Sequence, residues 1–226
     1  MGAMFATSSD GVHIAYEIHG TGPVLLLLHG FSNDRRLWTH HGWIRHLQPA
    51  FTVITMDMRG CGDSDAPLVP NAYHVEQHLA DVATVADACQ ADQLSLWGWS
   101  FGGTLGLHLA ARSPRICRAV IAGTYFGRLF TAAYVQRRLA EAVVPVVQAR
   151  WQGLHAWPGV APEDVQCPML VYTGTADGNV VVQLQQQRTA IEAAGMYLHV
   201  LNNLTHGGLV SALEVVAPII LPFLKS

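Results

Sequence analysis

The sequence predicts an α/β fold, in which a mostly parallel sheet of about eight strands carries helices on both faces. Short apolar runs alternate with longer helical stretches along almost the whole chain. Half of the 226 residues are hydrophobic and only 13% are charged, as a large buried core requires. A chain of this length is most simply one domain, so we expect residues 1–226 to form a single domain.

The first half of the chain supplies one edge and the centre of the predicted sheet. Residues 5–8 and 12–18 flank Asp10-Gly11, and the second segment alternates apolar and polar side chains, which predicts an antiparallel hairpin. The continuous apolar run at residues 24–28 is typical of a strand covered on both faces. Further strands are expected at residues 51–56 and 94–97, and helices at residues 34–47, 75–89 and 104–112.

The second half continues this alternation but has one irregular interval. Strands are expected at residues 118–122, 168–173 and 197–201, and helices at residues 180–194 and 209–224. The stretch between the first two of these strands is longer than a simple crossover. It predicts one long helix at residues 129–150, followed by a loop with Trp151 and Trp157. We interpret residues 124–166 as a small lid insertion at the carboxyl edge of the sheet.

Bulk properties exclude several classes of protein. A formal net charge of −3 offers neither the basic surface of a nucleic-acid-binding protein nor a polybasic membrane patch. Apolar runs such as residues 215–221 are too short to cross a bilayer. The four cysteines and twelve histidines lack metal-ligand spacing, and no disulfide framework is indicated. The N-terminus does not resemble a signal peptide, so we expect a cytoplasmic protein.

A glycine-rich turn lies between the strand at residues 94–97 and the helix at residues 104–112. It reads Gly98-Trp-Ser-Phe-Gly-Gly. In this context Gly-x-Ser-x-Gly is typical of a nucleophile elbow, a strained turn that exposes one serine hydroxyl at the carboxyl edge of a sheet. The glycines leave room where a Cβ would clash. Ser100 is therefore the candidate nucleophile, and the alternative is an ordinary helix N-cap serine.

The chain resembles the α/β-hydrolase superfamily over nearly its whole length, through an ordered set of motifs. His29-Gly30-Phe31 follows one predicted strand, residues 57–64 (Asp-Met-Arg-Gly-Cys-Gly-Asp-Ser) follow the next, and the elbow comes third. Asp177 and Thr205-His206-Gly207 follow the last two strands. The elbow variant, together with Trp38 after the His-Gly motif, is similar to small carboxylesterases, including those that clip methyl esters in biotin synthesis.

The resemblance implies a catalytic triad. A serine hydroxyl needs a base within hydrogen-bond reach, and the base needs an orienting acid. The superfamily order is serine, acid, histidine, which here gives Ser100, Asp177 and His206. Asp177 could instead only form a turn, and His206 could lack a catalytic role. Asp164 fits the position of the acid less well than Asp177. The implied oxyanion donors are the backbone N–H groups of Phe31 and Phe101.

Other polar residues are interpreted as structural. We expect His29 to brace its loop, and Asp57, Arg59 and Asp63 to form a solvated or salt-bridged loop; Cys61 lacks the elbow geometry of a nucleophile. Aromatic residues of the insertion predict an apolar wall of the substrate pocket, with the alternative that they only bury the insertion on the sheet. These residues are Tyr125, Phe126, Phe130, Trp151 and Trp157, of which Trp157 and Phe130 are our candidate substrate-binding residues.

The predicted function is the hydrolysis of short-chain carboxylic esters through an acyl-enzyme, without a metal or an organic cofactor. The implied partner is a small-molecule ester, not nucleic acid or a membrane. Lactonase, thioesterase and carbon–carbon bond hydrolase activity stay open, as does a ligand receptor that retains the triad. An aspartate nucleophile, as in epoxide hydrolases, is excluded at position 100. The sequence leaves the oligomeric state open.

Overall fold

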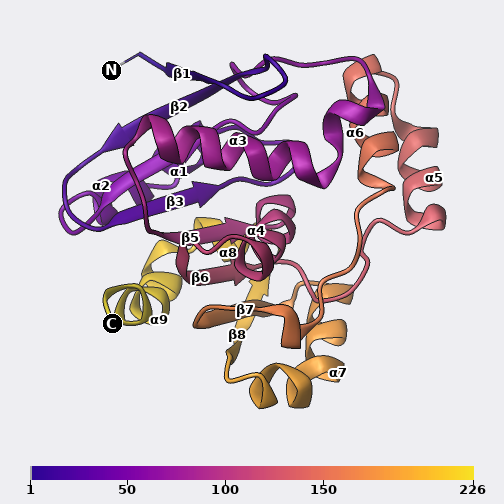
Figure 1. The fold of residues 1–226 in the computed structure, drawn as a ribbon. Coiled ribbons are helices and arrows are strands. Elements are labelled where there is room, and N and C mark those ends of the chain that lie inside the picture. Colours follow the sequence, from indigo (N-terminus) through magenta and orange to yellow (C-terminus); the bar gives the residue numbers. More distant parts are fainter. Residues whose placement is uncertain (1) are drawn as a thin grey trace.

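The computed structural model describes residues 2–226 and confirms the predicted α/β fold (Figure 1). Eight strands form one sheet in the order β1-β2-β4-β3-β5-β6-β7-β8. Only the pairs β1–β2 and β2–β4 are antiparallel, so the N-terminal hairpin forms one edge of a parallel sheet. The strands are β1 Met4–Thr7, β2 His13–His19, β3 Val24–Leu28, β4 Thr52–Met56, β5 Leu94–Trp99, β6 Ile116–Ala122, β7 Met169–Ala176 and β8 Tyr197–Thr205.

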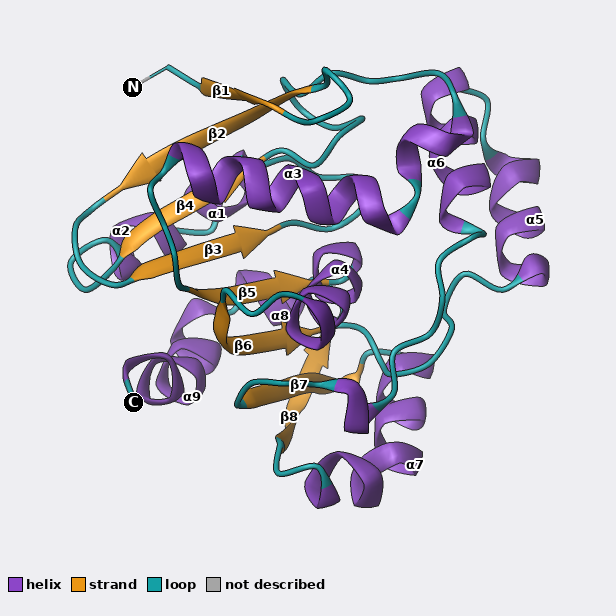
Figure 2. Ribbon diagram, viewed as in Figure 1, coloured by secondary structure: helices purple, strands orange, loops and turns teal. Residues whose placement is uncertain are grey.

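Helices cover both faces of the sheet (Figure 2). The helices are α1 Arg36–His40, α2 Trp43–Leu47, α3 Val75–Ala88, α4 Phe101–Arg112, α5 Ala132–Glu141, α6 Pro145–Leu154, α7 Asn179–Ala193, α8 Gly208–Ser211 and α9 Leu213–Lys225, with short 3₁₀ turns η1 Pro70–Tyr73 and η2 Pro162–Asp164. Helices α3, α4 and α7 pack on one face, and α1, α2, α8 and α9 on the other. None of the helices within residues 2–226 is both long and apolar enough to cross a membrane.

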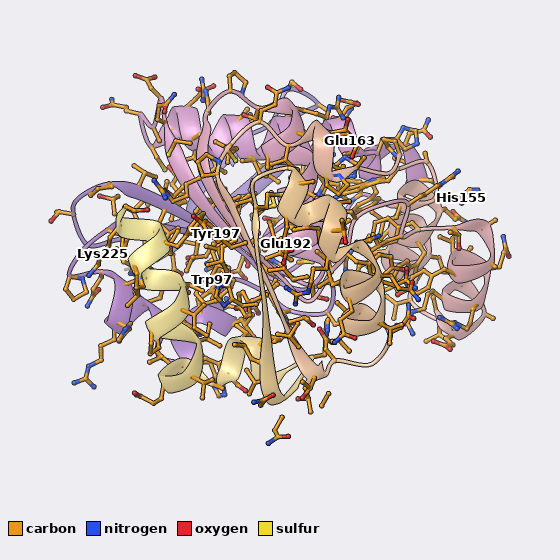
Figure 3. All side chains as sticks on the ribbon, turned by 90° about the horizontal axis from the view of Figure 1, so that it is seen from below. Trp97, His155, Glu163, Glu192, Tyr197 and Lys225 are labelled. Atoms are coloured by element: carbon orange, nitrogen blue, oxygen red, sulfur yellow. The ribbon has the colours of Figure 1, made fainter. Side chains whose placement is uncertain are left out.

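The alternation along β3 builds two separate cores. Leu26 and Leu28 belong to the core under α3 and α4, whereas Leu25 and Leu27 belong to the core under α1 and α9. Successive strand residues point to opposite faces, so an all-apolar strand supplies both layers at once. Trp97 lies in the interior of the second core, while His155 and Lys225 lie at the periphery (Figure 3).

Three predicted helices are interrupted. The segment at residues 34–47 splits into α1 and α2 at Gly42, whose φ of 79° ends the first helix. The predicted helix at residues 129–150 is wrong as one element: α5 ends at Glu141, and Pro145 begins α6. Proline is favoured in the first turn of a helix because it has no N–H to donate to a preceding turn. The C-terminal segment splits into α8 and α9 at Ala212.

Residues 124–166 form the segment that we call the insertion. It connects β6 to β7 and carries α5, α6 and η2. Helices α5 and α6 lie side by side beyond the carboxyl ends of β3, β5 and β6 (Figure 2). The insertion therefore lies at the edge of the sheet where the elbow is found, and its role as a lid stays a prediction.

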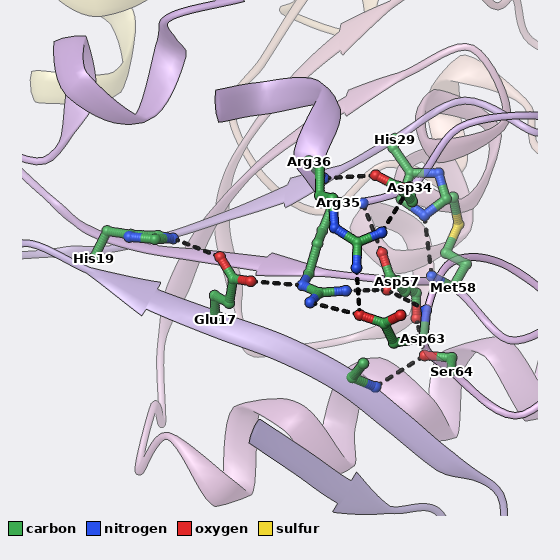
Figure 4. A network of polar contacts seen from close by, with 11 residues as sticks. Glu17, His19, His29, Asp34, Arg35, Arg36, Asp57, Met58, Asp63 and Ser64 are labelled. Atoms are coloured by element: carbon green, nitrogen blue, oxygen red, sulfur yellow. Dashed lines mark hydrogen bonds and ion pairs between the residues drawn. The ribbon is translucent and has the colours of Figure 1, made fainter. Parts of the chain in front are cut away.

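The loop after β4 is held by ion pairs, as the salt-bridged alternative predicted; Asp57 and Arg59 are buried, whereas Asp63 is partly exposed. Asp57 is fully buried and accepts hydrogen bonds from the guanidinium of Arg35 and from its backbone N–H, the latter at 2.6 Å (Figure 4). Arg35 also donates to Glu17 at 2.9 Å and to Asp63 at 2.8 Å. His29 braces its loop as predicted, because its Nε2 accepts the N–H of Met58 at 3.1 Å.

A second buried pair joins this loop to α3. Arg59 is fully buried and donates two hydrogen bonds to the carboxylate of Asp81, at 2.6 and 2.7 Å. Arg59 also donates to Asp10, at 2.8 Å, in the turn of the N-terminal hairpin. Removing one partner of such a pair leaves an uncompensated charge in the core.

We predict that Arg59→Met lowers the free energy of unfolding by about 3–5 kcal/mol, because the Asp81 carboxylate loses its buried partner. The double variant Arg59→Met/Asp81→Leu should recover much of that loss. Arg112→Met is the matched control, since Arg112 pairs with Glu76 at the surface, and it should change the value by less than about 1 kcal/mol. Urea unfolding followed by circular dichroism measures all three. Equal effects of the two single variants would contradict the prediction.

Candidate active site

Ser100 occupies a strained turn between β5 and α4. Its φ of 58° and ψ of −117° lie where residues other than glycine are seldom found. Two backbone hydrogen bonds hold this conformation: Ser100 N–H donates to Ala122 O at 2.8 Å, and Gly102 N–H donates to His29 O at 2.9 Å. The side chain makes no N-cap hydrogen bond to α4, which disfavours the reading of Ser100 as an ordinary cap.

The elbow glycines allow backbone segments to approach closely. A Cβ on Gly98 would overlap the carbonyl group of Gly102, and a Cβ on Gly102 would overlap that of Leu28. A Cβ on Gly103 would lie 2.8 Å from the carbonyl oxygen of Ala122. Since backbone atoms cannot move aside as a flexible side chain can, the first turn of α4 packs directly on β3 and β6.

The structure brings together the three side chains that the sequence singled out. His206, after β8, has its Nε2 atom 2.9 Å from Ser100 Oγ and its Nδ1 atom 2.7 Å from Asp177 Oδ1. Asp177, after β7, is buried, and its Oδ2 accepts the hydroxyl of Thr173 at 2.9 Å. With a proton on Nδ1, His206 can accept the serine proton at Nε2. Asp164 lies elsewhere, in η2, and accepts the N–H of Ala161, the residue that precedes this turn.

Two features of this arrangement were not predicted from the sequence. The indole N–H of Trp99 donates to His206 O at 3.0 Å, and the two rings lie 5.3 Å apart, so the end of β5 helps to place the histidine loop. Thr173 orients the second carboxylate oxygen of Asp177. A tryptophan and a threonine in buried strands are indistinguishable from core residues by pattern alone, so no sequence signal identifies either one.

One predicted oxyanion donor, Phe101, lies in the elbow directly after Ser100, and the other, Phe31, lies in the loop after β3. Phe31 follows β3 and Phe101 begins α4, and their rings contact edge to face with centroids 5.7 Å apart. Within residues 2–226, no backbone or side-chain acceptor takes the N–H of Phe31 or of Phe101. Both residues line the cavity onto which Ser100 opens. Two free N–H groups beside a nucleophile could stabilise a negatively charged oxygen.

This cavity has a volume of about 450 Å³ and is mostly apolar. The insertion supplies a large part of its wall, namely Tyr125, Leu129, Phe130, Tyr134, Arg137 and Trp151. Tyr134 and Arg137 were not predicted, because only the packing of α5 decides which of its faces meets the cavity. The size of the cavity suits a small organic molecule.

Phe130 lines the cavity, whereas Trp157 lies behind the wall. The Trp157 side chain is 1% exposed, and its indole N–H donates to Tyr73 O at 2.9 Å. Its ring packs against Phe101 and Phe130, with centroids 5.6 and 5.7 Å away. Our expectation that Trp157 contacts substrate is therefore wrong, because its indole is held behind the wall by Tyr73 O in η1 and by the rings of Phe101 and Phe130.

The profile of the alpha/beta hydrolase fold family matches residues 23–212. The chain belongs to this family. This α/β hydrolase is 30% identical over 150 residues to the pimeloyl-[acyl-carrier protein] methyl ester esterase of Aeromonas hydrophila, which covers 66% of this chain and 48% of that protein. It is 28% identical over 119 residues to epoxide hydrolase 4 of Mus musculus, covering 53% and 33%. The matched stretch thus spans about half or less of each of these relatives.

Solved structures share the whole architecture of this α/β hydrolase. An esterase from Exiguobacterium antarcticum superposes with a TM-score of 0.84 at 19% identity, and the alignment covers 100% of both chains. At that level of identity the likeness shows the fold. Together with the family match over residues 23–212, it shows that the whole chain has the fold of this family.

Trp157→Ala should lower the free energy of unfolding by about 3–5 kcal/mol, because it leaves a cavity in the core. It also leaves the Tyr73 carbonyl without its donor. Chemical denaturation measures the change. Arg128→Ala, at an exposed position of the insertion, is the control and should have little effect. A loss below about 1 kcal/mol for Trp157→Ala would place this side chain outside the core.

Proposed function

We propose that this hydrolase cleaves carboxylic esters with short acyl groups through an acyl-enzyme on Ser100. The observation that carries the proposal is the continuous line of hydrogen bonds from Asp177 through His206 to Ser100, which ends at the 450 Å³ cavity. A buried acid, a base and a hydroxyl in this order form the arrangement that activates a serine. Relatives named as esterases support the same class of reaction.

The first half-reaction forms the acyl-enzyme. Ser100 Oγ attacks the ester carbonyl carbon while its proton passes to His206 Nε2, and Asp177 stabilises the resulting imidazolium through Nδ1–H. The carbonyl oxygen becomes negatively charged and accepts hydrogen bonds from the N–H groups of Phe31 and Phe101. The bond to the alcohol oxygen then breaks, and His206 Nε2 returns the proton to the departing alcohol.

The second half-reaction releases the acid. A water molecule gives a proton to His206 Nε2 and attacks the acyl carbon, so the same two N–H groups receive the negative charge again. Breaking the bond to Ser100 Oγ returns the proton to the serine and frees the carboxylic acid. Opening an epoxide through an ester intermediate would need a carboxylate at position 100, where this chain has a hydroxyl.

The preference for short acyl groups rests on the size of the cavity and on its wall. Phe130 and Trp151 of the insertion limit the room beyond Ser100. Each buried CH₂ contributes about 0.8 kcal/mol only while the pocket has space for it. We propose that the insertion acts as a lid in this sense, as one wall of the site within a single domain, and that a small-molecule ester is the partner of this protein.

Ser100→Ala should lower kcat for p-nitrophenyl butyrate by a factor of about 10⁴–10⁶. The protein should stay folded. Asp177→Asn should lower kcat by about 10⁴, because the amide favours the wrong imidazole tautomer. Asp164→Asn is the matched control and should behave as the wild type. Steady-state kinetics on purified, folded variants measures the effects. Retained activity in Ser100→Ala would exclude the proposal, and a reversal of the two aspartate variants would place the acid on the other loop.

A panel of p-nitrophenyl esters should give the highest kcat/KM between about C2 and C6, with a decline for longer chains that outgrow the cavity. Phe130→Ala should move the optimum to longer acyl groups, and Trp157→Ala, behind the wall, should leave it in place. A lactone in the same panel tests the cyclic-ester alternative. Best activity on long-chain esters at an interface would show that the site is deeper than the cavity indicates.

A further inference from the structure

Arg150 is a buried cation without an acidic partner. Three arginines are almost fully buried, with exposed fractions of 3% for Arg35, 0% for Arg59 and 5% for Arg150. The first two are paired with Asp57 and Asp81. Within residues 2–226, no carboxylate lies within ion-pair distance of Arg150. A buried charge of this kind is costly unless its surroundings compensate for it.

Arg150 donates a hydrogen bond to the loop after β3 that carries Phe31, one of the predicted oxyanion donors. From α6, its Nη2 donates to the backbone carbonyl of Phe31 at 2.8 Å. Its guanidinium carbon lies 3.7 Å from the centroid of the Phe31 ring, and the indole of Trp151 stacks on the same ring at 4.1 Å. Two consecutive residues of α6 thus hold Phe31 by its ring and by its carbonyl group.

The surroundings of Arg150 keep it in place without neutralising it. A Cβ at Gly60 would lie 2.9 Å from Arg150 Cδ, so the glycine leaves the room that the arginine stem occupies. The thiol of Cys61 donates to the same Phe31 carbonyl at 3.7 Å. Burial lowers the pKa of Arg150, but a guanidinium stays protonated in proteins. The positive charge of Arg150 therefore remains, in contact with Phe31, the residue whose N–H is free.

We propose that Arg150 is a positioning residue of the oxyanion hole, which fixes the backbone of Phe31 and places an uncompensated positive charge behind it. Holding the ring and the carbonyl group sets the dihedral angles of Phe31, and these angles direct its N–H toward the reacting oxygen. The unpaired charge favours the negative charge that develops on that oxygen in the transition state. Helix α6, part of the insertion, thereby becomes part of the machinery of the reaction. This inference rests on the proposed ester hydrolysis at Ser100.

The test compares Arg150→Met and Arg150→Lys with the wild type in the full chain. Losing a whole oxyanion donor costs about 10²–10³ in kcat, and a displaced donor should cost less, so we expect Arg150→Met to lower kcat by about 10- to 100-fold. KM for p-nitrophenyl butyrate should stay within about threefold, because the substrate ground state carries no charge on that oxygen. Arg150→Lys keeps the charge and one donor and should recover part of the loss.

A second readout separates positioning from packing. Phenylboronic acid forms a tetrahedral adduct with a nucleophilic serine, and one of its oxygens then occupies the oxyanion position. Its inhibition constant should rise in each Arg150 variant in proportion to the loss of kcat, whereas inhibition by the uncharged substrate analogue butyramide should be unchanged. Arg128→Met is the matched control, because Arg128 also caps a carbonyl of the insertion, that of His155, away from Phe31. It should leave both constants as in the wild type.

The outcomes distinguish this inference from the function on which it rests. Absence of ester turnover in the wild type, or full turnover in Ser100→Ala, overturns the proposed function. If those two results are as expected, then wild-type kcat and boronate affinity in folded Arg150→Met overturn the role of Arg150 alone. If Arg150→Met does not fold, Arg150→Lys carries the test: a kcat and boronate affinity equal to those of the wild type, with the rigid guanidinium removed, would likewise overturn it.

Discussion

The strained backbone of Ser100 is the constraint on which the rest of the site depends. A serine with φ of 58° persists only where its surroundings hold it, and here the carbonyl groups of Ala122 and His29 do so. Ala122 is the last residue of β6 and His29 directly follows β3, and these are the strands on either side of β5. The elbow therefore fixes the positions of three adjacent strand ends at once, which brings the Phe31 loop beside the nucleophile. Because Gly98 and Gly102 are packed against backbone, this arrangement has almost no freedom to relax.

Charge is distributed unevenly around this frame. Arg35 and Arg59 join the loop after β4 to its neighbours through buried carboxylates, so their charges are neutralised where they serve the fold. At the cavity the pattern differs: Asp177 is buried behind His206, while Arg150 is buried without a carboxylate behind Phe31. The acid thus lies on the side where positive charge would develop on the imidazole, and the free guanidinium on the side where negative charge would develop on the substrate oxygen.

Local patterns were sufficient to predict the sheet and the elbow, because strand periodicity and a glycine-rich turn are visible in neighbouring residues. The acid and the histidine that meet Ser100 were predicted from the order of motifs by which the chain resembles the α/β-hydrolase superfamily. The sequence did not reveal features that depend on which helix face packs where. The sequence predicts one helix where Pro145 begins a second one, α6. It also predicts that Trp157 contacts substrate, whereas its indole N–H donates to Tyr73 O in η1. The sequence predicts Asp57 only as part of a solvated or salt-bridged loop, because its arginine partner lies in a different loop. No sequence pattern indicates a role for Arg150, because the proposed role depends on its contact with Phe31.

The most direct test of the account is to identify the residue that becomes acylated during turnover. Wild-type protein mixed with p-nitrophenyl acetate and quenched in acid within milliseconds should yield, by peptide mass spectrometry, an acetyl group on Ser100, with a matching burst of p-nitrophenol. Asp177→Asn should form the same adduct more slowly, because its amide favours the imidazole tautomer that cannot accept the serine proton. Turnover with the acetyl group on another residue, or without any acylated peptide, would contradict the central claim.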